Sequence, residues 1–83
     1  MNKSIAKQAV EYASSIMGLS DIKVHFKYQS FFPNKDVNSM FIPNGYYIVF
    51  SEYWLKNAKE LEVMKCGFHE TRHACQRTCN RFF

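Results

Sequence analysis

The stretch that decides the fold is GFHETRHACQRTCNRFF, residues Gly67–Phe83, at the end of the 83-residue sequence. Within it, His69, Glu70 and His73 form the pattern H-E-x-x-H. Successive residues of an α-helix are about 100° apart around its axis, so His73 lies about 40° from His69. Both imidazoles therefore project from one side of a helix, one turn apart. The stretch predicts a helix that carries a pair of histidines.

Two stripes of opposite character are expected on this helix. A polar stripe lies within about 40° of His69, and its members are His69, His73, Gln76 and Asn80. An apolar stripe lies about 220° to 280° from His69, and its members are Leu61, Met64, Phe68, Cys75, Cys79 and Phe82. We expect the apolar stripe to face the core, which leaves the histidines pointing away from it. Glu70, at about 100°, lies beside the polar stripe.

The N-terminal third of the sequence predicts one helix and one strand. Asn2 or Ser4 can cap a helix in which apolar residues recur at helical spacing, and Gly18 follows where a left-handed stop is favoured. The residues Ile22–Tyr28, IKVHFKY, then alternate apolar and polar side chains, which is typical of a half-buried strand. Residues 31–40, FFPNKDVNSM, are rich in turn formers and predict a connection.

The middle of the sequence predicts a hairpin followed by a helix. Asn44 and Gly45 form a strong hairpin signal, which pairs Met40–Ile42 with Tyr46–Phe50. A further helical stretch is expected to begin at Ser51 and to break near residue 57. The expected fold class is therefore α+β, with an N-terminal helix, a small and mostly antiparallel sheet and the C-terminal H-E-x-x-H helix. Residues 1–83 form one domain in this interpretation.

Composition and charge exclude several classes of protein. No apolar run reaches the roughly 18 residues that a membrane span needs, and the first residues lack the apolar stretch of a signal peptide. The net charge of +4 is spread along the chain without a basic block, so nucleic acid is not favoured as a partner. Three cysteines, an odd number, favour reduced thiols over a disulfide framework, and we expect a cytoplasmic protein.

The H-E-x-x-H spacing indicates a particular chemistry. Two imidazoles one turn apart can bind a single zinc ion, so His69 and His73 are the expected metal ligands and zinc the expected cofactor. The intervening Glu70 does not lie in line as a third ligand. In zinc peptidases with this spacing, a glutamate at that position acts as general base toward the attacking water, and Glu70 is the expected catalytic residue.

The segment FHETRHACQ, residues Phe68–Gln76, resembles the active-site helix of zincin metallopeptidases of the gluzincin type, particularly the ImmA/IrrE-like domains and the minimal gluzincins. The segment NGYYIVFSEYWLK, residues Asn44–Lys56, resembles the strand that precedes this helix, an edge strand that runs along the cleft and can pair with an extended peptide. The resemblance implies a zinc-dependent peptidase with a peptide or protein substrate. It matches His69 and His73 to the metal ligands and Glu70 to the general base.

The sequence departs from this family after the motif. Gluzincins take a third metal ligand, usually a glutamate, from a following helix, whereas the ten residues after His73 include neither an acidic residue nor a histidine. We therefore expect either a domain truncated at its C-terminus or a second copy that completes the fold or the site as a homo-oligomer. Within the chain, Cys79 is excluded as a ligand because a continuing helix carries it to the apolar side. Cys66 is a better placed candidate, although it strains the helix.

The remaining polar residues are expected to be solvated. These residues are His25, Glu52, Glu60 and Glu62, together with Arg72 and Arg77, which flank the polar stripe and could hold a substrate carboxylate. Three interpretations stay open. The first is a small zinc peptidase, and the second is a degenerate zincin-like domain without catalysis that acts as an interaction or regulatory module. The third is a small basic adaptor in which the motif is accidental, touching nucleic acid in a salt-sensitive way.

Overall fold

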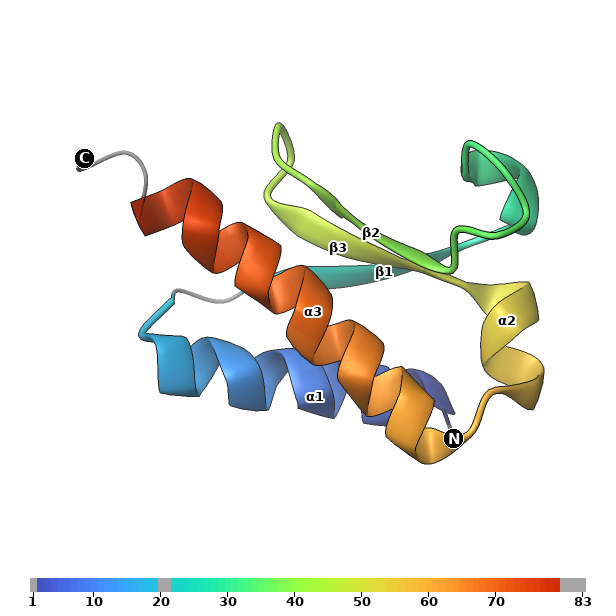
Figure 1. The fold of residues 1–83 in the computed structure, drawn as a ribbon, viewed down its shortest axis with the longest axis horizontal. Coiled ribbons are helices and arrows are strands. Elements are labelled where there is room, and N and C mark those ends of the chain that lie inside the picture. The colour runs from blue at the N-terminus through green and yellow to red at the C-terminus, as the bar shows by residue number, and fades with distance from the viewer. Residues whose placement is uncertain (1, 20–21, 80–83) are drawn as a thin grey trace.

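The computed structural model describes residues 2–19 and 22–79. Its elements follow the expected order and confirm the α+β class. They are helix α1 (Asn2–Met17), strand β1 (Lys23–Lys27), the short 3₁₀ helix η1 (Gln29–Phe31), strands β2 (Ser39–Ile42) and β3 (Tyr47–Ser51), and helices α2 (Glu52–Asn57) and α3 (Glu60–Cys79). Figure 1 shows α1 and α3 together beneath the three-stranded sheet, with α2 at the end of β3.

The sheet is mixed, with strand order β1-β3-β2, whereas the sequence predicted a mostly antiparallel sheet. Strand β2 pairs with β3 in antiparallel fashion, as the hairpin signal predicted, but β1 pairs with β3 in parallel. The central position suits β3 because Ile48, Val49 and Phe50 are fully buried on both of its faces. The long connection between β1 and β2 lets the chain pass to the far side of β3.

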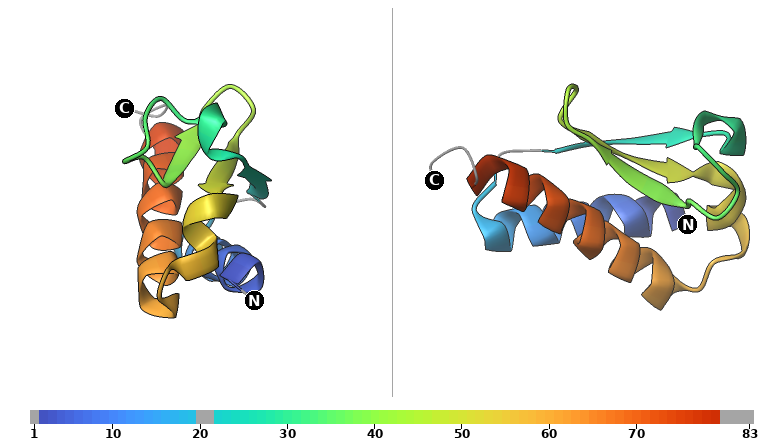
Figure 2. Two further views of the ribbon diagram at one scale, coloured as in Figure 1. Left: turned by 90° about the vertical axis from the view of Figure 1, so that its right-hand side faces the viewer. Right: turned by 45° about the horizontal axis from the view of Figure 1, so that its top comes forward.

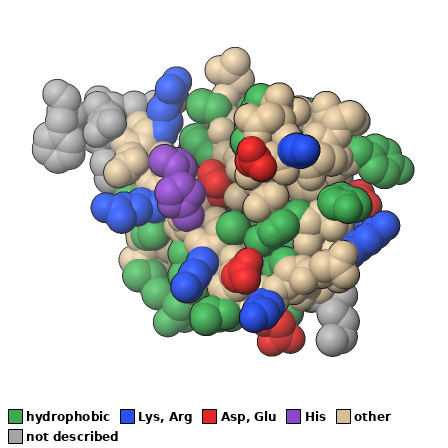
Figure 3. Space-filling model, turned by 45° about the vertical axis from the view of Figure 1, so that its right-hand side comes forward, with side chains coloured by type: hydrophobic (Ala, Val, Ile, Leu, Met, Phe, Trp, Pro, Cys, Tyr) green, Lys and Arg blue, Asp and Glu red, His purple; other side chains and the backbone are tan. Residues whose placement is uncertain are grey.

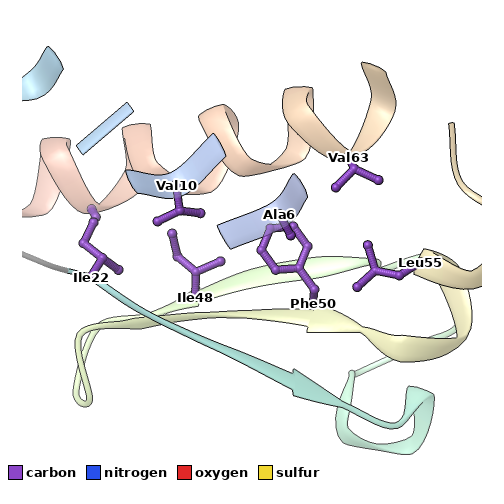
Figure 4. Packing of buried hydrophobic residues seen from close by; sticks show 8 residues of the cluster. Ala6, Val10, Ile22, Ile48, Phe50, Leu55 and Val63 are labelled. Atoms are coloured by element: carbon purple, nitrogen blue, oxygen red, sulfur yellow. The ribbon is translucent and has the colours of Figure 1, made fainter. Parts of the chain in front are cut away.

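The core lies between the sheet and the two long helices. Figure 4 shows Ile48 and Phe50 pointing from β3 toward Ala6 and Val10 of α1. The buried cluster comprises Ala6, Val10, Ile22, Ile48, Phe50, Leu55, Val63 and Ala74. Strand β1 presents Val24 to this core and keeps Lys23 and its other polar residues exposed, which confirms the alternation seen in the sequence.

The face that α3 turns toward the core differs from the predicted one. Leu61, Met64 and Phe68 were expected to be buried, but all three are exposed. Cys75 is half-buried, while the side chain of Cys79 and residue 82 lie outside the described part. The buried side of α3 instead comprises Val63, Gly67, Glu70, Thr71 and Ala74.

Close packing of small residues explains this rotation of α3. Gly67 lies against α1, where a Cβ atom added to the glycine would stand 2.8 Å from the Cβ of Ala9. Because the two helix backbones approach so closely, the side of α3 that carries small side chains packs against the alanines of α1. The larger apolar side chains are therefore turned outward.

The ends of the helices follow local rules. Gly18, at a φ of 69°, takes the left-handed conformation expected after α1. The hydroxyl of Ser51 accepts a hydrogen bond from the backbone N–H of Trp54 at 3.2 Å and caps α2, as the sequence predicted. In the hairpin, the left-handed residue is Tyr46, at a φ of 53°, instead of a residue of the Asn-Gly pair.

Within residues 2–19 and 22–79, no helix combines the length and apolar character needed to cross a membrane.

Candidate metal centre

The two motif histidines lie one turn apart on α3, and the edge of one ring is directed at the face of the other. The Nε2 atoms of His69 and His73 are 3.1 Å apart, and the ring planes meet at 87°. A tetrahedral zinc ion with Zn–N bonds of about 2.0–2.1 Å holds two nitrogen ligands about 3.3 Å apart. The observed separation is close to this value, but it is also a hydrogen-bond distance, so binding one ion requires both Nε2 atoms to be unprotonated and the rings to turn.

Both histidines are exposed to solvent, as the position of the polar stripe predicted. Figure 3 shows histidine side chains gathered on the surface, with basic side chains and an acidic one around them. An exposed pair is accessible to a metal ion and to a substrate. The two imidazoles are suitable ligands for zinc, because neutral imidazoles are among the ligands that zinc prefers in proteins.

Glu70 lies on the side of α3 that faces strand β2 and is only 7% exposed. The Ser39 hydroxyl donates a hydrogen bond of 2.9 Å to its Oε2 atom. This bond holds the carboxylate between the helix and the edge strand, and a buried carboxylate needs such a partner. Glu70 is therefore a positioned group and not a solvated surface residue.

Ser39 also contacts the thiol of Cys66, one turn before Glu70 on α3. Burial raises the pKa of the Cys66 thiol, and the negative charges of Glu70 and Glu62 raise it further. The hydrogen bond with Ser39 acts in the opposite direction and lowers this pKa. The net direction of the shift in the Cys66 pKa is upward.

A shallow, open groove of about 490 Å³ lies at the surface between α3 and strand β2. Its walls are Ser39, Met40, Phe41 and Pro43 from the β2 segment, and Glu70, His73 and Arg77 from α3. Strand β2 is an edge of the sheet, so within residues 2–19 and 22–79 no strand pairs with one side of its backbone. The groove thus combines one histidine, the buried carboxylate and a free strand edge.

The other polar residues singled out in the sequence lie elsewhere. His25 is on β1, where its ring packs edge-on against Tyr47, and it does not join the motif histidines. Glu52 lies 3.7 Å from the ammonium of Lys3. Exposed positions on α3 are occupied by Glu60, Glu62, Arg72 and Gln76, and residue 80 lies outside the described part.

A third protein ligand is not found in the described part of the chain. Among residues 2–19 and 22–79, no three His, Cys, Asp or Glu side chains gather in a way that would hold a metal ion. A catalytic zinc site uses three protein ligands and keeps a fourth position open. The described residues therefore fit the metal through two histidines, and a complete site needs one more ligand.

Sequence reasoning missed the role of Ser39, which it placed in a connecting segment. The residue begins β2, and its partner in the sheet register is Phe50, whose side chain points into the core. Ser39 therefore shares the face of the sheet that meets α3. Ser39 precedes Phe41 by two residues, so the two side chains share one face of a strand. This spacing is informative only once the start of the strand is known.

Comparisons with known proteins add no relative. No protein-family model, curated protein or solved structure matches the chain.

Proposed function

We propose that this chain is a zinc-dependent peptidase domain of the zincin type, acting on extended peptide segments. The observation that carries the proposal is the convergence of the His69 and His73 Nε2 atoms, 3.1 Å apart, beside a groove that also contains Glu70. The cytoplasm is the compartment we propose, which rests on the odd number of cysteines.

Each residue has a separate role in this proposal. His69 and His73 hold the ion, and zinc would supply Lewis acidity toward a water molecule and a peptide carbonyl. Glu70 takes the proton of the attacking water and passes it to the leaving amine. The edge of β2 offers backbone N–H and C=O groups to an extended peptide, which places a peptide bond along the groove.

The third ligand has to come from outside the described residues in this proposal. A second copy of the chain is the source we favour, because the exposed histidine pair can be reached by another molecule. This requirement makes hydrolysis dependent on protein concentration.

A second candidate function is a zincin-like domain that binds metal without hydrolysing peptides. The observation that favours it is the donor set of two histidines, which falls short of a catalytic site. In this case the groove and the edge of β2 serve to bind a peptide, as an interaction module would.

Peptide hydrolysis by Glu70→Gln separates these functions. The probe is a set of fluorescence-quenched, unstructured peptides, assayed with added zinc at several protein concentrations. We expect Glu70→Gln to keep its zinc and to lose about 10²- to 10⁴-fold in rate, because a general base contributes that much. The matched control is Glu62→Gln, which removes an exposed carboxylate from the same helix and keeps the wild-type rate.

Equal rates for wild type and Glu70→Gln would contradict the catalytic role of this residue. A wild-type protein that binds zinc but hydrolyses none of the peptides would support the second candidate function instead.

A further inference from the structure

The proposed function gives no role to Arg77, although this residue lines the groove between α3 and β2 together with Glu70 and His73. Arg77 is exposed, and it forms no ion pair with the residues that the structure describes. A guanidinium has five N–H donors in a planar arrangement that matches a carboxylate. Beside a binding groove, these donors are accessible to a ligand.

The fold separates the two arginines that the sequence placed beside the histidines. Arg77 follows Glu70 by seven residues, so the two side chains lie about 20° apart around α3. Arg72 lies about 160° from Glu70, on the opposite side of the helix, and is not among the residues that line the groove. Of the two arginines, Arg77 is therefore the one that a ligand in the groove can reach.

Two hydrogen bonds fix the direction of the groove. Ser39 donates to Glu70 at 2.9 Å, and the hydroxyls of Tyr46 and Thr78 form a hydrogen bond of 3.1 Å at the other end. Strand β2 therefore runs beside α3 in the same direction along the chain. Figure 2 shows α3 on the β2 side of the sheet and α1 on the β1 side. Arg77 is adjacent to Thr78 and so lies at the hairpin end of the groove.

The charge that the groove presents to a ligand is positive. Glu70 is the acidic residue among its walls, but it is only 7% exposed and already accepts a hydrogen bond from Ser39. Arg77 is the exposed charged residue among the same walls, and the β2 segment contributes apolar side chains. An acidic side chain in the groove therefore gains a partner of opposite charge, whereas a basic side chain is repelled by Arg77.

The spacing along α3 determines where such an acidic side chain lies. His73 and Arg77 are four residues apart, which is about 6 Å along the helix axis. An extended peptide advances about 3.3 Å per residue, so this interval corresponds to about two residues of the peptide. Because alternate side chains of a strand point to the same side, a residue beside His73 and the second residue along can both face α3.

We propose that Arg77 selects extended peptides that carry an aspartate or glutamate about two residues from the peptide bond beside His73. The guanidinium binds the side-chain carboxylate through two N–H donors, while the edge of β2 binds the peptide backbone. The groove is open at the surface, so the peptide can continue past Arg77 and the carboxylate need not be a C-terminus. Recognition of the carboxylate needs no metal, whereas the position of the cleaved bond rests on the proposed peptidase function.

Binding of fluorescent, unstructured peptides to the zinc-free protein tests this recognition. Two peptides with amidated C-termini share one apolar sequence and differ at a single internal residue, which is glutamate or glutamine. We expect the glutamate peptide to bind about fivefold more tightly in fluorescence anisotropy, equivalent to about 1 kcal/mol, and the preference to decrease with salt. A third peptide, with the glutamine and a free C-terminal carboxylate, should bind like the amidated glutamine peptide.

Arg77→Gln is the variant that should abolish the preference for the glutamate peptide. The matched control is Arg72→Gln, which removes an exposed arginine from the opposite side of the same helix and should retain the preference. Arg77 also lies in the last turn of α3, where a basic side chain interacts favourably with the helix dipole. Far-UV circular dichroism therefore accompanies the binding measurement, and we expect both variants to keep the helix content of the wild type.

Three results of the binding measurement would overturn the proposal. The first is equal binding of the glutamate and glutamine peptides to the wild type, or no binding of either. The second is an equal loss of the preference in Arg72→Gln and Arg77→Gln. The third is a preference that follows the free C-terminal carboxylate and not the internal glutamate.

Hydrolysis with added zinc separates this proposal from the proposed function. We expect mass spectrometry to place the cleaved bond about two residues from the glutamate, and Arg77→Gln to lower kcat/KM for this peptide about fivefold. Hydrolysis of both peptides at equal rates, without a binding preference, would support the peptidase and contradict selection by Arg77. A binding preference that depends on Arg77, without hydrolysis, would support recognition of the carboxylate and contradict the peptidase.

Discussion

At the junction of α3 and β2, one serine connects two side chains of the helix. Ser39 donates a hydrogen bond to Glu70 and contacts the thiol of Cys66. The carboxylate beside the histidine pair is thereby held by the edge strand.

The raised pKa of Cys66 leads to a prediction about pH. Since burial disfavours the thiolate, the folded protein holds the thiol proton at a higher pH than the unfolded chain. The corresponding stability is fully present below the ordinary thiol pKa of about 8.5 and is lost as the pH rises through the raised folded value. In a Cys75→Ala/Cys79→Ala variant, we expect alkylation of Cys66 by iodoacetamide to show a higher midpoint pH in the native state than in urea.

Ser39→Ala is the partner variant for this measurement. Removing the hydrogen bond that lowers the Cys66 pKa should move the native midpoint still higher. A native midpoint at or below the midpoint in urea would contradict the burial of the thiol, and an unchanged or lower native midpoint in Ser39→Ala would contradict the contact with Ser39.

The positions of the helices and strands could be predicted from the sequence better than the side that each of them turns toward the core. Gly18, Ser51 and the hairpin residues mark element ends through local chemistry, and the structure confirms these ends within a few residues. The rotation of α3 could not be predicted in the same way. Hydrophobic periodicity selected the stripe of Leu61 and Phe68, whereas close contact of small residues with α1 decided which side is buried.

Gly67→Ala tests this close contact. The new methyl group would lie 2.8 Å from the Cβ of Ala9, so the helices must separate. We expect the overpacking cost of about 1–3 kcal/mol to exceed the helix-propensity gain of about 1 kcal/mol. Urea unfolding of Gly67→Ala, Ala9→Gly and the double variant measures the coupling between the two positions.

In this double-mutant cycle, the loss of stability in the double variant should be little more than the loss caused by Ala9→Gly alone. Most of the stability that Gly67→Ala loses is then recovered. Additive effects of the two substitutions would show that the methyl group is accommodated without contact, which contradicts the packing described for α1 and α3.

For the whole molecule, the order of helices and strands along the chain was predictable. The pairing of the strands and the contacts between residues far apart in the sequence were predictable only in part. The parallel pairing of β1 with β3 depends on which strand can be buried on both faces, and only the complete fold shows that this is β3. The predicted histidine pair is brought together by a single helix, because four residues span one turn. The hydrogen bond between Ser39 and Glu70 joins residues 31 apart in sequence, and local pattern does not encode it.

The measurement that tests the metal centre most directly is zinc content per chain, determined by elemental analysis after purification without a histidine tag. The protein is compared with His69→Ala/His73→Ala and with His25→Ala, which removes an exposed histidine on β1. Bound zinc should also raise the unfolding free energy, by about 2.7 kcal/mol at a free concentration one hundred times Kd. We expect zinc in the wild type and in His25→Ala and its loss in the double variant. Equal zinc in all three proteins, or none in the wild type after zinc is added, would contradict a metal centre at these histidines.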